Sequence, residues 1–202
     1  MKPILLTAAG SPENQDRGIV IHDGARLVLC IADGAGGRSG GTQAANMATE
    51  FLRQNASAAE TPESCSELLR RMDAAIATDS VAGETTCALA VVKADEIFGS
   101  SVGDSGIWLI AESGTQVDLT RGQQRKPFVG SGGAWPVSFR HPMRRGFLLL
   151  ATDGLLKYTS AERIIATCQQ PLIETAAQHL IQLVRYDSGA LPDDVTLILT
   201  KL

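Results

Sequence analysis

Residues 27–37, LVLCIADGAGG, hold the clearest strand signal in this sequence. Six apolar residues in a row, Leu27 to Ala32, form a run of strand length, and Asp33-Gly34 ends it. A glycine directly after the aspartate permits a sharp turn that leaves the carboxylate and the backbone carbonyl directed at one spot. The stretch therefore predicts a buried strand that places an acidic side chain at its end.

The same combination of an apolar run and an aspartate recurs further along the chain. Asp104 follows one apolar run, Asp153 follows another, and Asp193-Asp194 precedes the last one. A single aspartate beside a glycine after a strand is most often only a turn. Four such ends that converge would instead offer the carboxylate and carbonyl oxygens that Mg²⁺ and Mn²⁺ prefer.

The order of strands and helices predicts an α+β layered sandwich. Short strands come in two groups with helical segments between and after them, which argues against a parallel βαβ sheet. We expect the second group of strands to form an antiparallel meander and residues 120–145 to be a loop over a surface or site edge. The expected strands are residues 2–7, 18–21, 27–32, 85–92, 97–102, 107–111, 116–119, 147–151 and 195–200, and the expected helices are 42–55, 64–77, 160–168 and 172–186.

Length, charge and cysteine usage narrow the classes of protein. The 202 residues fit one domain, 1–202. A net charge of −4 and a pI near 5.4 give no broad positive field for nucleic acid. The apolar runs are strand-sized, which predicts no membrane segment, and the chain is expected to be cytoplasmic. Cys30, Cys65, Cys87 and Cys168 lack metal-site spacing and are expected to be buried free thiols.

Six short motifs occur in an order that resembles the metal-dependent protein phosphatases of the protein phosphatase 2C type. They are Glu13-Asn14-Gln15-Asp16, Ala32-Asp33-Gly34-Ala35-Gly36-Gly37, Gly83-Glu84-Thr85-Thr86, Ser101-Val102-Gly103-Asp104-Ser105, Thr152-Asp153-Gly154 and Asp193-Asp194-Val195-Thr196. The closing Asp193-Asp194 is similar to the bacterial branch with the sporulation stage II E-type and stress-response regulatory phosphatases. The resemblance implies a four-layer αββα sandwich, two antiparallel sheets flanked by helices, with a two-metal centre at one edge.

The resemblance also implies roles for particular residues. Asp33 matches the carboxylate that bridges both metals, and the carbonyl of Gly34 matches a ligand of one of them. Asp153 and Asp193 match the remaining carboxylates on the other metal. These three aspartates are therefore the expected catalytic residues, acting through water on the metals.

Two further acids and the reaction follow from the same resemblance. Asp104 matches the acid that helps to hold a third, weaker ion, and Asp16 matches an acid just behind the ligands. The implied cofactors are two Mg²⁺ or Mn²⁺ ions, with a third in some relatives. Two such cations make water a nucleophile at neutral pH and offset the charge on the phosphoryl oxygens. The implied partner is a protein phosphorylated on serine or threonine.

One departure from the family pattern leaves the phosphate anchor open. The arginine that binds substrate phosphate in relatives is Ser11 in this chain. Arg17 and Arg38 are candidates to replace it, although a solvated arginine is the simpler interpretation of each. The missing arginine also motivates an alternative, a non-catalytic module with the phosphatase fold that binds a phosphoprotein. Phosphodiester or nucleotide hydrolysis is a further alternative, because a two-metal site alone does not fix the substrate.

Overall fold

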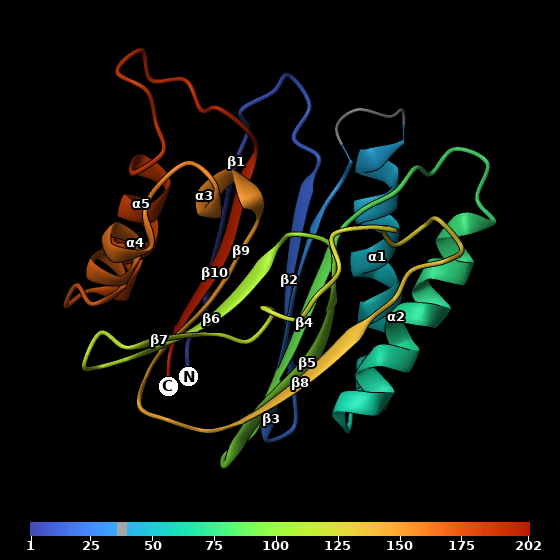
Figure 1. The fold of residues 1–202 in the computed structure, drawn as a ribbon, viewed down its shortest axis with the longest axis horizontal. Coiled ribbons are helices and arrows are strands. Elements are labelled where there is room, and N and C mark those ends of the chain that lie inside the picture. Colours follow the sequence, from blue (N-terminus) through green and yellow to red (C-terminus); the bar gives the residue numbers. More distant parts are fainter. Residues whose placement is uncertain (36–39) are drawn as a thin grey trace.

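Two antiparallel sheets pack face to face at the centre of the molecule, and helices cover both outer faces (Figure 1). The computed structural model describes residues 1–35 and 40–202. One sheet has the order β1-β10-β9-β6-β7 and the other β2-β3-β4-β5-β8. The strands are β1 Ile4–Ala8, β2 Asp16–Asp23, β3 Arg26–Asp33, β4 Cys87–Val92, β5 Glu96–Val102, β6 Gly106–Ala111, β7 Gln116–Asp118, β8 Val137–Pro142, β9 Gly146–Ala151 and β10 Val195–Lys201. This arrangement confirms the predicted α+β sandwich.

The helices form the two outer layers of the sandwich. In Figure 1, α1 and α2 lie over the sheet that contains β2 and β3, and α4 and α5 lie over the sheet that contains β1 and β10. The helices are α1 Gly41–Asn55, α2 Pro62–Ala77, α3 Asp153–Leu156, α4 Ala161–Cys168 and α5 Ile173–Gln182, with a 3₁₀ turn at Ala56–Ala58. Thr61 and Ser64 form a capping box at the start of α2, so this helix begins two residues before the predicted position.

Strand β3, which holds the apolar run Leu27 to Ala32, contributes side chains to two hydrophobic cores. Along β3, Val28 and Cys30 belong to the core beneath α1 and α2, whereas Leu29 and Ile31 belong to the core between the sheets. Side chains of a strand alternate between its two faces, so a continuous apolar run is buried on both sides. All four cysteines are buried free thiols, as predicted.

Two predictions about the second half of the chain were wrong. The expected meander is divided between the sheets, because β5 pairs with β4 and β8 whereas β6 pairs with β7 and β9. Residues 120–145 are not one loop, because β8 lies within them. This edge strand alternates half-buried and exposed residues, so it carries no continuous apolar run. Among residues 1–35 and 40–202, no helix is long and apolar enough to cross a bilayer.

Candidate active site

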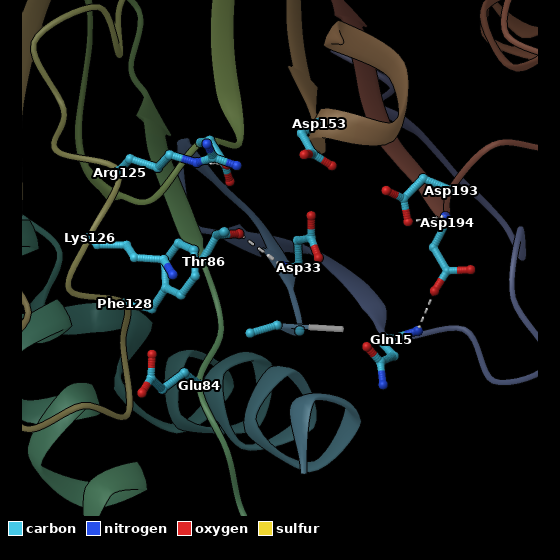
Figure 2. Close-up of a pocket in the computed structure, with 13 residues that line it drawn as sticks. Gln15, Asp33, Glu84, Thr86, Arg125, Lys126, Phe128, Asp153, Asp193 and Asp194 are labelled. Carbon is cyan, nitrogen blue, oxygen red and sulfur yellow. Dashed lines mark hydrogen bonds and ion pairs between the residues drawn. The ribbon is translucent and has the colours of Figure 1, made fainter. Parts of the chain in front are cut away.

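The ends of strands from both sheets surround an open cavity of about 370 Å³ (Figure 2). Asp33 and Asp104 reach it from the end of β3 and the β5–β6 turn, and Asp153 and Asp193 reach it from the start of α3 and the segment before β10. The structure therefore brings together the four acids that the sequence singled out. The cavity is lined by Gln15, Asp33, Gly34, Ala35, Glu84, Thr86, Asp104, Arg125, Lys126, Phe128, Asp153, Asp193 and Asp194.

Hydrogen bonds to the two residues just before β4 fix Asp33 on the floor of this cavity. Its N–H donates to Thr86 Oγ1 at 2.9 Å, and its carbonyl oxygen accepts from the N–H of Thr86 at 2.8 Å and from Thr85 Oγ1 at 2.9 Å. A Cβ atom on Gly34 would lie 2.5 Å from the carbonyl oxygen of Gly41, at the start of α1. Only glycine lets the chain pass this close to the helix, which accounts for the Asp-Gly pair.

A close backbone contact also positions the acids of the other sheet. Asp153 is the first residue of α3, the one-turn helix that follows β9. A Cβ atom on Gly154 would lie 1.9 Å from the carbonyl oxygen of Asp194. The start of α3 and the segment that carries Asp193 are therefore in direct backbone contact, which keeps Asp153 and Asp193 on the same side of the cavity (Figure 2).

Asp194 organises the N-terminal segment rather than only continuing the acidic pair. Its Oδ1 accepts hydrogen bonds from the N–H groups of Gly10 at 2.8 Å and Ser11 at 3.1 Å, and its Oδ2 accepts from the N–H of Gln15 at 2.8 Å. The Ser11 hydroxyl also lies within hydrogen-bond distance of this carboxylate and of the carbonyl of Glu13. Ser11, which stands where relatives have the phosphate-binding arginine, therefore helps to hold the N-terminal segment around Asp194.

Asp16 lies behind the cavity and not in its lining. It is opposite Asp33 in the β2–β3 pair and is 2% exposed. Thr152 Oγ1 donates to Asp16 Oδ2 at 2.8 Å and accepts from the N–H of Thr196 at 2.9 Å. This chain of hydrogen bonds joins β2 of one sheet to β10 and to the residue after β9 in the other, beside Asp33 and Asp153.

The acids raise one another's pKa because they are close together and partly removed from water. Burial, followed by the charges of Asp16, Asp153 and other acids, raises the pKa of Asp33 from 3.8 to about 9. Burial, opposed by the hydrogen bond from Thr152, raises the pKa of Asp16 to about 7. Burial and the charges of Asp104 and Asp193 also raise the pKa of Asp153. Bound cations would remove this repulsion.

The donor set fits hard divalent cations. It consists of carboxylate oxygens and the Gly34 carbonyl, without histidine or cysteine in the lining of the cavity. Within the described residues, no three His, Cys, Asp or Glu side chains are close enough to form a ready-made ligand group for one ion. The acids instead surround a shared space, which suits ions held partly by water and partly by substrate, as is usual for Mg²⁺.

Of the two arginines that the sequence offered as phosphate anchors, only Arg17 lies within the described residues. Arg17 is not part of the cavity lining: its Nε donates to Asn46 Oδ1 at 2.5 Å and its Nη1 donates to the carbonyls of Asn14 and Asp16. Arg38 lies outside the described residues. An arginine that the sequence did not single out, Arg125, lines the cavity and donates from Nε to Asp104 Oδ2 at 2.8 Å.

The segment that carries Arg125 was expected to lie over a surface or site edge, but Arg125 itself was not singled out. Lys126 and Phe128 line the cavity together with Arg125 (Figure 2). The position of Arg125 depends on contacts distant in sequence, so no local pattern could identify it. The abundance of arginine and glycine in residues 120–145 was the one available signal.

Comparisons with known proteins identify a family and solved structures that share this fold. The family model described as "Protein phosphatase 2C" matches residues 8–184. A search of curated proteins found no match. Among solved structures, a bacterial serine phosphatase is 20% identical, with a TM-score of 0.88 and coverage of 100% of this chain and 97% of that one. The catalytic domain of the serine/threonine phosphatase PstP, in complex with two manganese ions, is 22% identical (TM-score 0.82, coverage 98% and 96%).

A third solved structure also shares this fold. RsbX in complex with magnesium is 18% identical, with a TM-score of 0.77 and coverage of 99% of this chain and 94% of that one. Identities at this level show a shared fold, whereas the family model matches most of this sequence. The fold, the family match and the order of the acidic motifs together place this chain in the protein phosphatase 2C family.

Proposed function

We propose that this chain is a metal-dependent phosphatase that removes phosphate from serine or threonine in a protein substrate, with residues 1–202 acting as one catalytic domain. The observation that carries the proposal is the convergence of Asp33, Asp104, Asp153 and Asp193 on one open cavity. The solved relatives that hold manganese and magnesium support Mg²⁺ or Mn²⁺ as the cofactor.

The acids divide into ligands and supporting groups. Asp33 and the Gly34 carbonyl would supply oxygens to one ion. Asp33, Asp153 and Asp193 would hold the other in part through water, because the three carboxylates are not close enough to form a ligand group by themselves, and Asp104 would be available to a third. Divalent cations bound there would supply Lewis-acid chemistry, acidifying water and offsetting negative charge on the phosphoryl group. No side-chain nucleophile is then required.

The protein contributes fixed positions for these oxygens. Asp33 is held by Thr85 and Thr86, and the start of α3 is held against the Asp194 backbone. The Asp16 carboxyl, with a pKa near 7, binds a proton at Oδ1 or Oδ2 close to neutral pH when no cation is present. When cations occupy the cavity, the ionised Asp16 adds negative charge behind Asp33 and favours their retention.

Hydrolysis of p-nitrophenyl phosphate and of a phosphothreonine peptide, titrated with Mn²⁺ and Mg²⁺, tests the proposal. We expect activity that depends on the cation and is abolished by a chelator. Asp33→Asn is expected to lose at least about 100-fold in kcat/KM, because the shared ligand is lost. The control Asp187→Asn changes an exposed aspartate outside the cavity and is expected to stay within about twofold.

The same experiment separates the alternatives. No hydrolysis with either cation, together with binding of the phosphopeptide, would contradict the enzyme and favour the non-catalytic module. Faster hydrolysis of bis-p-nitrophenyl phosphate than of the monoester would instead indicate a phosphodiesterase.

A further inference from the structure

The cavity has very few positive charges for a site that must receive a phosphate dianion. Its lining contains six acidic side chains but, within the described part of the chain, only two cationic ones, Arg125 and Lys126. Ser11 and Arg17 are engaged elsewhere by hydrogen bonds. Among the described residues, the two cations that line the cavity therefore lie on the side opposite Asp193 and Asp194 (Figure 2).

Of the two cations, Arg125 is the better placed to bind phosphate. Its Nε donates to Asp104 Oδ2, and its Nη groups donate no hydrogen bond to any residue within 1–35 and 40–202. The fork of a guanidinium group matches two phosphate oxygens. The Nζ of Lys126 lies 5.4 Å from the centroid of the Phe128 ring and interacts with its face. The bond to Asp104 orients Arg125 and leaves its outer edge free.

The backbone around Arg125 is anchored on both sides. The carbonyl of Gln124 accepts from the N–H of Gly103 at 3.1 Å, directly before Asp104. Val129 and Thr85 exchange two backbone hydrogen bonds of 2.9 and 3.0 Å, directly beside the strand contact that holds Asp33. The segment from Gln124 to Val129 thus connects the Asp104 turn to the Asp33 floor, so Arg125 has a defined place relative to both acids.

A buried carboxylate extends this anchoring to helix α2. Asp73, which is 5% exposed, accepts at Oδ1 from the N–H groups of Gly130 at 2.7 Å and Gly132 at 3.0 Å, and at Oδ2 from the N–H of Ala134 at 3.0 Å. Residues 130–134 are therefore fixed on the helix layer. The Arg125 segment is a built part of the cavity wall.

We propose that Arg125 binds the phosphoryl group of the substrate, supplying from the segment after β7 the positive charge that Ser11 cannot supply from the N-terminal segment. This inference rests on the proposed phosphatase function. Arg125 contacts the substrate through its Nη groups while Nε stays on Asp104. Lys126 contributes charge without a directed contact.

Steady-state kinetics with p-nitrophenyl phosphate and inhibition by inorganic phosphate test this role. Arg125→Ala is expected to raise KM and the inhibition constant of phosphate together by about 10- to 100-fold, with kcat changed by less than about threefold. Arg125→Lys keeps the charge but loses the fork, so its KM and phosphate inhibition constant should lie between those of the wild type and Arg125→Ala. Lys126→Ala should shift KM by about threefold or less. Arg145→Ala, an exposed arginine outside the cavity lining, is the matched control and should leave KM unchanged.

Two measurements distinguish this inference from its alternatives. The Mn²⁺ concentration at half-maximal activity is measured for each variant, and a KM increase that merely follows a shift in that midpoint would overturn the role of Arg125. An unchanged KM and phosphate constant in Arg125→Ala would overturn it while leaving the phosphatase function intact. If the wild type hydrolyses nothing, the proposed function fails, and calorimetric titration of the Mg²⁺-loaded protein with phosphate still tests Arg125.

Discussion

Replacing Asp194 tests whether its carboxylate holds the N-terminal segment in place. The side chain is largely buried, at 7% exposed, and accepts hydrogen bonds from the N–H groups of Gly10, Ser11 and Gln15. Asp194→Ala removes all of these acceptors at once. Asp194→Asn can keep its oxygen toward Gly10 and Ser11, but it then directs an amide N–H₂ at the N–H of Gln15.

The magnitude follows from the number of donors left without a partner. A donor deprived of its acceptor costs about 1–3 kcal/mol, and less where water can replace the partner, as it can around the exposed Gly10 and Ser11. We therefore expect Asp194→Ala to lower the free energy of unfolding by about 3 kcal/mol and Asp194→Asn by about 1–2 kcal/mol. For a domain of this size, a loss of about 3 kcal/mol lowers Tm by roughly 6–12 °C.

Urea denaturation in the presence of a chelator measures this loss without a contribution from bound cations. The exposed Asp187→Asn serves as the control, with an expected change of less than about 0.5 kcal/mol. If Asp194→Ala unfolds at the same urea midpoint as the wild type, or if Asp194→Asn is the less stable of the two variants, then the carboxylate does not hold the segment as argued.

Two further predictions concern pH and the α2 anchor. Because burial raises the pKa of Asp33 to about 9 and of Asp16 to about 7 from 3.8, the native state without cations binds more protons than the unfolded state between about pH 4 and 9. Its stability should therefore fall as pH rises from 5 to 8, and saturating Mn²⁺ should flatten this slope; a urea midpoint that rises with pH under chelation would contradict it. Asp73→Ala leaves three backbone N–H groups without an acceptor and should lower the free energy of unfolding, measured by urea denaturation, by about 2–4 kcal/mol. It should also raise KM, measured from initial rates. An unchanged KM would show that residues 130–134 do not position the cavity wall.

Most of the fold could be predicted from the sequence because its strongest signals are local. Runs such as Leu27 to Ala32 are apolar on both faces, so they indicate strands buried between two layers. The assignment of strands to the two sheets could not be predicted, because it depends on contacts between residues that are distant in sequence. The turn at Gly103, with a φ of 106°, passes from β5 in one sheet to β6 in the other, and a hairpin of equal length would show the same pattern.

The sequence indicated the acids by their position at strand ends and Asp16 by resemblance, but it indicated neither Asp73 nor Arg125. Asp33, Asp104 and Asp153 follow apolar runs, which is visible in the sequence. Asp73 occupies a position within a helical pattern, and Arg125 lies in a segment without periodicity. The function of each depends on backbone groups or a carboxylate elsewhere in the chain, and only the folded structure brings these groups together.

The cavity spans the seam between the two halves of the sandwich. Asp33 extends from one sheet, while Asp153 and Asp193 extend from the other, and the inter-sheet core residues Ile31 and Leu150 lie two and three positions before Asp33 and Asp153. The separation of the acids is thus set by how the two sheets stack. Cation affinity would then depend on that stacking. Conservative substitutions in the core between the sheets would therefore alter the affinity for magnesium or manganese.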